Sequence, residues 1–381
     1  MASLKATAKE SLAGILRLFS RKPAIVFESA PDFADNTFAV FRELWTRGYG
    51  KKYQFVWSCS GVEQLPASYG KIKYIHPMGQ GLKAKLKNAY YMANAKCMIS
   101  CNRFLLPWRK NQVAIYLAHG TPMKSVYGYY WVPKAIHYCL SAAPGVEEMT
   151  AYQFHADRKK MFSLGYPRND LLCHPCDVKK ILNTQCEKVV VWYPTFRQHN
   201  KREKLGSGHA MPIIHDAQAA RSLNEWAVEK NVLIVMKPHF AQDLTYIKDL
   251  GLSNIRFIDD GLFREHNITS YSFVAGCDGL LTDYSSIYFD YMLCDKPIGL
   301  IWEDVEEYRQ NPGFAVDLAE YGQGGVIIFT LPELKRFIED IAAGTDTCKE
   351  NRNALCDRVN FSRDGKNSAR VADFIVEKAK L

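Results

Sequence analysis

Short apolar runs alternate with helix-length amphipathic stretches along the first half of the chain. The apolar runs occupy residues 24–28, 53–58, 72–75, 96–100, 113–118, 136–141 and 160–164. Apolar residues recur with helical spacing between these runs, most clearly over residues 36–47 and 81–93. Such alternation is typical of βαβ units and of a parallel sheet with helices on both faces. We therefore predict an α/β domain over residues 23–175.

The same alternation begins again after a polar stretch that follows Asp170. Its apolar runs occupy residues 188–192, 232–236, 255–258, 279–282, 297–302 and 326–329. Helical patterns occupy residues 216–229, 285–293, 331–342 and 368–380. A second α/β domain is therefore predicted over residues 186–362, followed by a C-terminal helix within residues 363–381. The predicted fold class is α/β, with two doubly wound parallel-sheet domains.

Residues 1–22 have the pattern of a basic amphipathic helix. One stripe of this helix is apolar, with Leu4, Leu12, Ile15, Leu16 and Phe19. Basic residues surround the stripe, namely Lys5, Lys9, Arg17, Arg21 and Lys22. Such a helix either lies on an anionic lipid surface or packs on the body of the protein. The pattern is compatible with both alternatives.

The overall composition is that of a folded globular protein. Of the 381 residues, 48% are hydrophobic and 23% are charged, which excludes a disordered, collagen-like or coiled-coil chain. The 11 cysteines are scattered from Cys59 to Cys356 and no secretory signal precedes them, so we expect a reducing cytoplasm rather than a disulfide scaffold. No apolar run approaches the roughly 18 residues that a membrane-spanning helix needs, so the chain is not expected to cross a membrane.

Positive charge is concentrated in the N-terminal third of the chain. Residues 1–125 hold 19 basic and 6 acidic side chains, a net charge of +13, whereas the whole chain carries +9. The remainder is therefore net negative. Such asymmetry predicts a polyanionic partner, which would be an anionic membrane surface, a phosphate-rich substrate or nucleic acid. The alternative is a solvated basic face without a partner.

Polar side chains follow the apolar run that ends near residue 117. Here the sequence reads His119, Gly120, Thr121, with Lys124 shortly after. Ligands bind beyond the carboxyl ends of strands in parallel sheets, so these residues occupy a position where chemistry is expected. An imidazole that titrates near neutrality suits a general base, and Gly120 lets the backbone approach a ligand closely. The alternative for His119 is a buried histidine that hydrogen-bonds to backbone carbonyls.

Two strands of the second predicted domain also end in residues suited to an anion. Thr195 and Arg197 follow the run at 188–192, and Lys237 and His239 follow the run at 232–236. Arginine forms bidentate contacts with phosphate oxygens, although a structural salt bridge is an equal alternative for Arg197. The two histidines that end strands, His119 and His239, thus lie in opposite halves of the chain.

A further motif begins at the end of the run at 279–282. It contains Thr282, Asp283, Ser285 and Ser286 and leads into a helical pattern. Either serine is placed as an N-cap, so that hydroxyls and backbone N–H groups meet at a helix start. Such a start binds phosphate through its N–H groups and the positive end of the helix dipole, or serves as an ordinary cap.

Several other active-site signatures are missing from the sequence. There is no glycine-rich nucleotide loop and no G-x-S-x-G nucleophile motif. Cys173 and Cys176 form a lone C-x-x-C without a second pair, which argues against a zinc site. No carboxylate cluster demands a metal, so no metal ligands are predicted, and dependence on a divalent cation is left open.

Four motifs in this order resemble those of the CDP-glycerol glycerophosphotransferase family, which builds teichoic acids and related capsular polymers. They are H-G-T-P-x-K at 119–124, G-x-P-R-x-D at 165–170, Y-P-T-x-R at 193–197 and T-D-Y-S-S-x-x-F-D-Y at 282–291. The resemblance covers roughly residues 110–305, about half of the chain.

The resemblance implies a GT-B-like enzyme whose two α/β domains face each other across a cleft. Such an enzyme transfers glycerol phosphate, or a related polyol phosphate, from a CDP-activated donor to a hydroxyl of a lipid-linked acceptor and releases CMP. The implied catalytic residues are His119, as the general base, and His239. The implied donor-binding residues are Gly120, Thr121, Thr195, Arg197, Lys237, Thr282, Asp283, Ser285 and Ser286.

The resemblance also implies partners and a location. The donor would be CDP-glycerol or CDP-ribitol, bound by the domain at 186–362. The acceptor would be an undecaprenyl-diphosphate-linked saccharide, met by the domain at 23–175 on the cytoplasmic face of a bacterial cell membrane. The basic N-terminal third would supply a peripheral contact with that anionic surface.

Three alternatives compete with this interpretation. One is a ribitol-phosphate transferase of the same family, and another is a nucleotide-sugar glycosyltransferase or epimerase of the same architecture, because fold does not decide function. The third is a nucleic-acid-binding protein. The sequence contains no DNA- or RNA-binding motif and no block of basic residues, so no nucleic-acid partner is expected.

Overall fold

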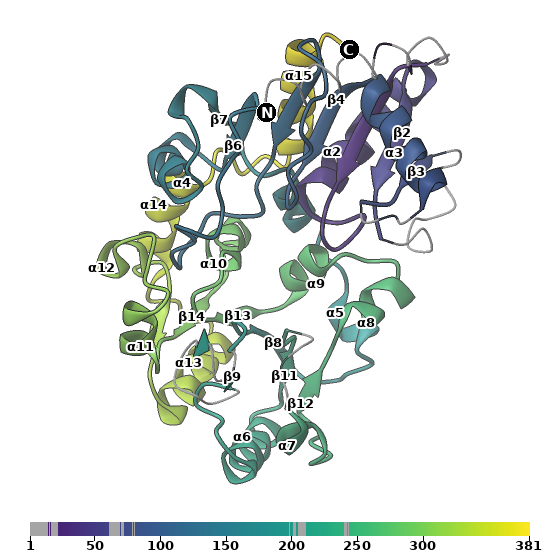
Figure 1. Ribbon diagram of the computed structural model, residues 1–381. Helices are drawn as coiled ribbons and strands as arrows, with labels where there is room; N and C mark the ends of the chain where they lie inside the picture. The colour runs from purple at the N-terminus through teal and green to yellow at the C-terminus, as the bar shows by residue number, and fades with distance from the viewer. Residues whose placement is uncertain are drawn as a thin grey trace. The chain divides into compact units, whose positions relative to one another are not determined.

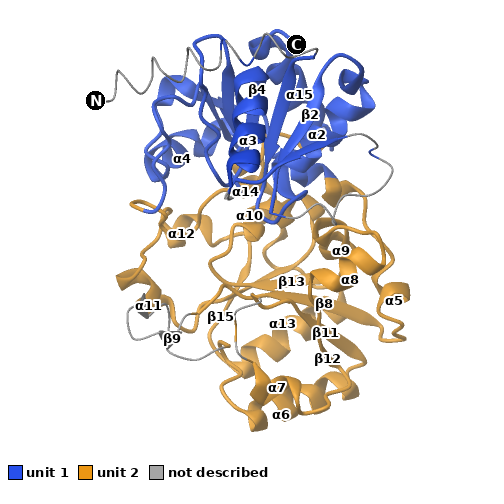
Figure 2. Ribbon diagram, turned by 45° about the vertical axis from the view of Figure 1, so that its right-hand side comes forward, with its two compact units in different colours: residues 1–119, 129–170, 364–381 blue, residues 120–128, 171–363 orange. Residues whose placement is uncertain are grey.

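The computed structural model divides the chain into two compact units, coloured separately in Figure 2. Unit 1 comprises residues 1–119, 129–170 and 364–381, and unit 2 comprises residues 120–128 and 171–363. The structure describes residues 14, 16, 22–60, 69, 72–77, 79, 81–197, 199–200, 203–204, 211–239, 242 and 244–381. The amphipathic helix predicted over residues 1–22 therefore lies outside the described residues, apart from Gly14, Leu16 and Lys22.

Unit 1 is built on a seven-stranded sheet in the order β3-β2-β1-β4-β5-β6-β7, in which every neighbouring pair is parallel. The strands are β1 (Ala24–Glu28), β2 (Gln54–Ser58), β3 (Lys73–Ile75), β4 (Ala95–Ser100), β5 (Val113–Tyr116), β6 (Tyr138–Ser141) and β7 (Met161–Ser163). All five residues of β1 are buried, as expected for a parallel sheet covered on both faces.

Two helices of unit 1 lie where the spacing of apolar residues predicts them, at residues 36–47 and 81–93. Among the described residues, the α-helices of unit 1 are α2 (Asp35–Thr46), α3 (Leu82–Asn94), α4 (Glu147–Gln153) and α15 (Asn367–Ala379), labelled in Figure 1. Short 3-10 turns add η1 (Tyr49–Lys51), η3 (Pro144–Val146) and η4 (Arg158–Lys160), and η5 (Pro167–Cys173) begins in this unit.

Unit 2 contains a six-stranded parallel sheet in the order β12-β11-β8-β13-β14-β15. Its strands are β8 (Lys188–Tyr193), β11 (Val232–Met236), β12 (Ile255–Phe257), β13 (Gly279–Thr282), β14 (Ile298–Ile301) and β15 (Val326–Ile328), and a small antiparallel pair is formed by β9 (His199–Asn200) and β10 (Glu203–Lys204). Its core packs β8 and β11 against helices that include α6 (Ala217–Glu229) and α13 (Leu331–Ala343).

The remaining helices of unit 2 are mostly short. They are α5 (Val178–Ile181), α7 (Thr245–Lys248), α8 (Asp260–Glu265), α9 (Ser270–Gly276), α10 (Ile287–Tyr291), η6 (Met292–Cys294), α11 (Val305–Gln310), α12 (Leu318–Tyr321) and α14 (Lys349–Val359). The helix predicted over residues 285–293 is thus an α-helix of five residues that continues as a 3-10 turn. The prediction of two parallel-sheet α/β domains is confirmed.

The C-terminal helix α15 belongs to unit 1 although unit 2 precedes it in sequence. The side chain of Asp170 accepts the backbone N–H groups of Asn367 and Ser368, at 2.8 and 2.7 Å, and so holds the start of this helix. Phe374 stacks on Phe162 with ring centroids 4.0 Å apart. These contacts tie the end of the chain to the segment that carries the G-x-P-R-x-D motif.

The chain passes between the units at points that differ from the expected domain boundaries. It enters unit 2 directly after His119, returns at Tyr129, leaves again after Asp170 and returns at Asp364. Residues 120–128 join unit 2 by pairing with another of its loops, since Ser125 N–H donates to Gly313 O at 2.8 Å and Ala315 N–H donates to Met123 O at 2.9 Å. The H-G-T-P-x-K motif is therefore divided between the units.

Candidate functional site

His119 follows β5, at the carboxyl end of the unit 1 sheet, and is half-buried. Its Nδ1 lies 3.3 Å from the carbonyl oxygen of Cys101, the residue that follows β4. A carbonyl oxygen only accepts hydrogen bonds, so Nδ1 carries the proton in this contact and Nε2 is the basic nitrogen of the neutral ring. The rings of Tyr130 and Phe154 lie beside the imidazole, with centroids 5.2 and 6.2 Å away. The arrangement suits a general base.

A buried carboxylate supports the loop that holds the imidazole. Glu28 ends β1 and is 1% exposed, and its Oε2 accepts the backbone N–H groups of Asn102 and Arg103 at 3.2 and 2.9 Å. Burial raises the pKa of Glu28, and these hydrogen bonds oppose the rise. Glu28 therefore braces the residues next to the Cys101 carbonyl.

The residues after His119 contribute to unit 2. Gly120 has a φ of +135°, a conformation that L side chains rarely adopt. Thr121 is 1% exposed, and within the described part of the chain its Oγ1 is buried without a hydrogen-bond partner. Lys124 pairs through its main chain with Phe314. Burial lowers the pKa of Lys124, whereas the charge of Asp283 raises it and that of Arg197 lowers it further.

Arg197 forms the centre of a buried ionic network in unit 2. Its side chain is 1% exposed. Nη1 donates to Asp283 Oδ2 at 2.7 Å and to Thr195 O at 3.0 Å. Nε and Nη2 donate to the two carboxylate oxygens of Asp304 at 2.8 and 3.0 Å. A guanidinium has five N–H donors, and four of them are used here within the protein. This geometry favours the structural salt bridge over an arginine that faces an anion.

Asp283 joins the network from the end of β13. Its carboxylate accepts the backbone N–H of Thr195 at 2.9 Å and the Thr195 hydroxyl, and it accepts the N–H of Tyr284 at 2.7 Å. The Tyr284 hydroxyl donates to Asp304 Oδ1 at 3.0 Å. The loops that follow β8, β13 and β14 are therefore locked together by charged hydrogen bonds.

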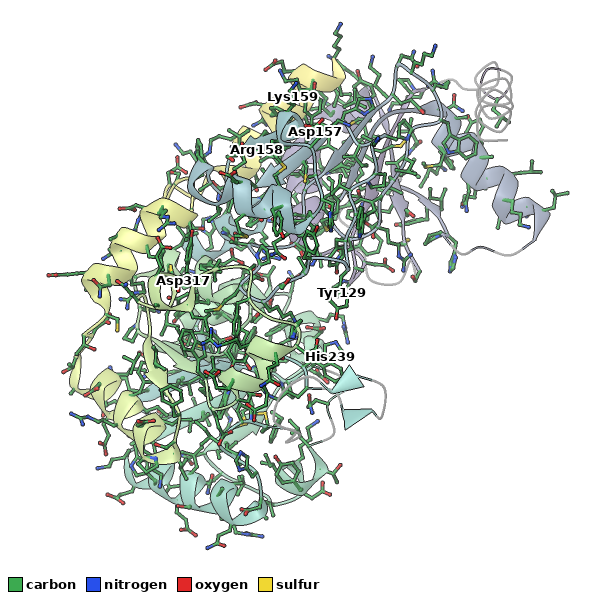
Figure 3. The ribbon with its side chains drawn as sticks, turned by 60° about the vertical axis from the view of Figure 1, so that its left-hand side comes forward. Tyr129, Asp157, Arg158, Lys159, His239 and Asp317 are labelled. Atoms are coloured by element: carbon green, nitrogen blue, oxygen red, sulfur yellow. The ribbon has the colours of Figure 1, made fainter. Side chains whose placement is uncertain are left out.

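Lys237 and His239 follow β11, the neighbour of β8, and His239 is labelled in Figure 3. His239 is exposed, and its ring lies beside that of Phe196 with centroids 4.7 Å apart. Partial desolvation of the ring by its neighbours, followed by the charges of Lys237 and Lys124, lowers its pKa. Lys237 pairs with Asp260 at 3.1 Å and lies over the ring of Tyr193. Positive charge therefore gathers around His239, which is neutral above its lowered pKa.

Some residues of the motif at the end of β13, Thr282 to Ser286, form hydrogen bonds that stabilise the fold. The Thr282 hydroxyl donates to Tyr193 O at 2.9 Å, so it ties β13 to β8. Ser285 and Ser286 are half-buried. Ser286 is the N-cap residue of α10, as the sequence predicts for one of the two serines, but its side chain makes no capping hydrogen bond. The two serine hydroxyls are the members of this motif best placed to serve a ligand.

The predicted residues thus divide between two groups. His119 belongs to unit 1, and Gly120 and Thr121 lie in the segment 120–128 of unit 2. The others end or follow β8, β11 and β13 of unit 2, at the carboxyl ends of strands, where ligands bind in parallel sheets. Within the described ranges, no three His, Cys, Asp or Glu side chains are grouped to hold a metal ion. No described helix combines the length and the apolar character needed to span a bilayer.

Sequence reasoning missed two acidic residues of these groups, Glu28 and Asp304. Both stand at or just after the end of a predicted strand, at residues 24–28 and 297–302. Their position at a strand end is the feature of the sequence that could have identified them. Their hydrogen-bond partners could not be predicted, because the N–H groups and the guanidinium that they bind come from distant parts of the sequence.

Comparisons with known proteins agree with this architecture. The chain is 24% identical over 411 residues to a teichoic acid glycerol-phosphate transferase of Staphylococcus aureus, and the match covers 98% of both chains. It is also 24% identical over 298 residues to a teichoic acid ribitol-phosphate primase of Bacillus spizizenii, covering 71% of each. Two structures of the wall teichoic acid polymerase TagF superpose on this chain with TM-scores of 0.74 and 0.73, both at 20% identity. Each superposition covers 99% of this chain and 97% of the TagF chain.

A UDP-GlcNAc 2-epimerase from Neisseria meningitidis shares the fold more distantly, with a TM-score of 0.54 at 12% identity. The sequence model of one family, CDP-Glycerol:Poly(glycerophosphate) glycerophosphotransferase, matches residues 13–377. That match extends well beyond the motifs and includes both units. The chain therefore belongs to the CDP-glycerol:poly(glycerophosphate) glycerophosphotransferase family.

Proposed function

We propose that this chain transfers glycerol phosphate from CDP-glycerol to a hydroxyl of a lipid-linked saccharide and releases CMP, in the synthesis of teichoic acid or a capsular polymer. The observation that carries the proposal is the contact between His119 Nδ1 and the Cys101 carbonyl, in a chain of this family. It makes Nε2 the basic nitrogen at the carboxyl end of a parallel sheet.

In the proposed reaction, His119 Nε2 accepts the proton of the acceptor hydroxyl. The hydroxyl oxygen then attacks the phosphorus that bears glycerol, and the bond from this phosphorus to the oxygen bridging to CMP breaks. The bridging oxygen leaves on CMP. Phosphoryl transfer of this kind depends on positioning and on stabilisation of the developing charge.

Unit 2 supplies the proposed donor site. Lys124, Lys237 and His239 provide positive charge or donors for the diphosphate, together with the hydroxyls of Ser285 and Ser286. The buried Thr121 hydroxyl, next to Gly120, is a further proposed donor.

Thr195, Arg197, Thr282 and Asp283 act in this proposal as the scaffold that orders the donor site. Their side chains are already engaged with each other or with the main chain. His239 acts on the diphosphate, where its protonation on binding would offset charge on the leaving CMP.

The proposed acceptor is an undecaprenyl-diphosphate-linked saccharide, reached at the cytoplasmic face of a bacterial membrane. Unit 1 offers a surface suited to an anionic bilayer on α3, where Leu82 and Leu86 are 74% and 55% exposed and stand one helical turn apart. The lysines at 83, 85 and 87 are exposed beside them. Exposed leucines among lysines are typical of helices that lie in a membrane interface.

The test is CMP release by the purified protein from CDP-glycerol and, in parallel, from CDP-ribitol, with a lipid-diphosphate disaccharide as acceptor. We expect release from CDP-glycerol and a loss of about 10²- to 10⁴-fold in His119→Gln, the usual value of a general base. His155→Gln is the matched control, a histidine of the same unit that stacks on Trp131.

Each other outcome has a defined meaning. Release from CDP-ribitol alone would assign the polyol to the ribitol branch of the family. Release from neither donor, with turnover of a UDP- or GDP-sugar, would contradict the proposed function. Repeating the assay after removal of divalent cations with EDTA decides whether the reaction needs a metal ion.

A further inference from the structure

The G-x-P-R-x-D motif at 165–170 has no part in the function proposed above. Its arginine, Arg168, lies in unit 1 and is nearly buried, with 8% of its side chain exposed. We propose that Arg168, together with Asp35 and Asn36, is a positioning set that holds the main chain of His119 in the turn that presents its imidazole. This inference rests on the proposed role of His119 as the general base.

Arg168 contacts the main chain of His119 directly. Its Nη1 donates to the carbonyl oxygen of His119 at 2.8 Å and to Asp35 Oδ1 at 2.9 Å. One nitrogen thus joins the histidine to a carboxylate at the start of α2. The Asp35 carboxylate is itself 15% exposed and also accepts the N–H of Asn36 at 2.7 Å. A charge-assisted hydrogen bond in such a buried setting is strong and directional.

Asn36 holds the two residues before the histidine. It is fully buried, and its Nδ2 donates to Leu117 O at 3.3 Å and to Ala118 O at 3.0 Å. Its Oδ1 accepts the backbone N–H of Arg168 at 3.2 Å. The carbonyls of three consecutive residues, 117 to 119, are therefore bound by the side chains of Asn36 and Arg168, and Asn36 also binds the main chain of Arg168.

The turn needs such support because of its backbone conformation. Ala118 has a φ of +51°, in the left-handed region that alanine rarely adopts. A residue in this conformation persists only when its surroundings over-determine it. The turn sets the direction of the His119 Cα–Cβ bond, and the Cys101 carbonyl then sets the rotation of the ring. The positioning set and the Cys101 carbonyl thus orient the same imidazole, one through the main chain and the other through the ring.

The position of Arg168 is fixed by the fold of its own motif. Gly165 has a φ of +82°, and a Cβ there would lie 2.2 Å from Asn367 Oδ1, so the chain packs tightly on α15 just before Arg168. Asp170 holds the start of the same helix. The glycine and the aspartate of the motif therefore anchor the segment, and the arginine acts on the active-site turn.

The test compares Arg168→Lys and Asp35→Asn with the wild-type protein. Lysine keeps the charge but lacks the planar fork, and asparagine keeps the shape and tolerates the φ of +59° at position 35 while it removes the charge. The matched control is Arg158→Lys, in an exposed ion pair with Glu148 at 3.0 Å and labelled in Figure 3.

Two readouts separate positioning from other roles. We expect kcat for CMP release from CDP-glycerol to fall about 10²-fold in Arg168→Lys, the usual effect of a displacement near 1 Å, with KM changed by less than about twofold. We also expect the ¹³Cε1–¹Hε1 NMR signal of His119, identified by its loss in His119→Gln, to move in both variants and not in Arg158→Lys.

The outcomes that would overturn the inference are distinct from those that bear on the proposed function. An unmoved His119 signal in both variants, or a raised KM with kcat unchanged, would contradict the positioning role of Arg168. Full activity of His119→Gln would instead contradict the role of His119 as general base, and the NMR signal of His119 in the other variants would still report on the positioning set. If Arg168→Lys does not fold, Asp35→Asn decides by the same two readouts.

Discussion

Replacing Arg197 by methionine tests whether this arginine stabilises unit 2 or contacts the donor. The substitution keeps an unbranched side chain of similar length and removes the charge that lies between Asp283 and Asp304. Both carboxylates would stay buried, since they are 0% exposed in the structure. Deleting one partner of a buried ion pair costs about 3–5 kcal/mol, because the remaining charge lacks compensation. Asp283 keeps its hydrogen bonds from Thr195, which argues for the lower half of this range.

This cost should appear as a large fall in the melting temperature of unit 2. For a domain of 150–250 residues, about 1 kcal/mol corresponds to roughly 2–4 °C, so a cost of about 3–4 kcal/mol corresponds to a decrease of roughly 6–16 °C. Differential scanning calorimetry measures it directly. Arg158→Met is the control, because its exposed ion pair with Glu148 is worth at most about 1 kcal/mol. The double variant Arg197→Met with Asp304→Asn should melt above Arg197→Met alone, since one uncompensated charge is removed.

The same variant can refute the structural role of Arg197. If Arg197→Met melts like the Arg158→Met control while its KM for CDP-glycerol rises about tenfold, the guanidinium binds the donor rather than the carboxylates. A lowered melting temperature with near-normal KM at a temperature where the variant is folded would support the scaffold. An unchanged melting temperature with a raised KM and a lowered melting temperature with a near-normal KM thus distinguish a guanidinium that binds the donor from one that binds Asp283 and Asp304.

Three further predictions follow from the geometry. Desolvation and two lysines lower the pKa of His239, and a bound diphosphate would raise it, so CDP-glycerol should bind more tightly as the pH falls towards the pKa of His239 in the free protein. Calorimetry in buffers of different ionisation enthalpy should show the accompanying uptake of a proton. An affinity that is independent of pH and unchanged in His239→Gln would contradict this prediction. Leu82→Ser with Leu86→Ser should weaken binding to anionic liposomes in co-sedimentation at least about tenfold, since each leucine is worth about 1.5–3 kcal/mol when buried, whereas Leu106→Ser on the same unit should not. Gly165→Ala should lower the free energy of unfolding, measured in urea, by more than about 1 kcal/mol, because the φ of residue 165 is +82° and the new Cβ would overlap a side chain of α15. An unchanged free energy of unfolding would mean that this segment repacks to accommodate the methyl group.

The strands and the larger helices were readable from the sequence because each depends on local periodicity. The apolar run at 24–28 is β1 with the same bounds, and the helix predicted at 216–229 is α6 at Ala217–Glu229. Short helices such as α7 and α12 were not predicted, since four residues contain too little periodic signal. The entry of residues 120–128 into unit 2 was also unpredictable, because it depends on pairing with residues 313–315, far along the chain.

The sequence by itself also predicted that the candidate site residues lie at the ends of strands. His119 was expected at a strand end of the first domain and His239 and Asp283 at strand ends of the second, and the structure has each just after a strand of its own unit. Which partners each of these residues binds was decided by the tertiary structure. Arg197 and Asp283 bind one another, and Arg168 holds the turn of His119, through contacts between residues 86 and 49 positions apart. Local patterns fix secondary structure, whereas burial and long-range pairing decide which charges remain available to a ligand.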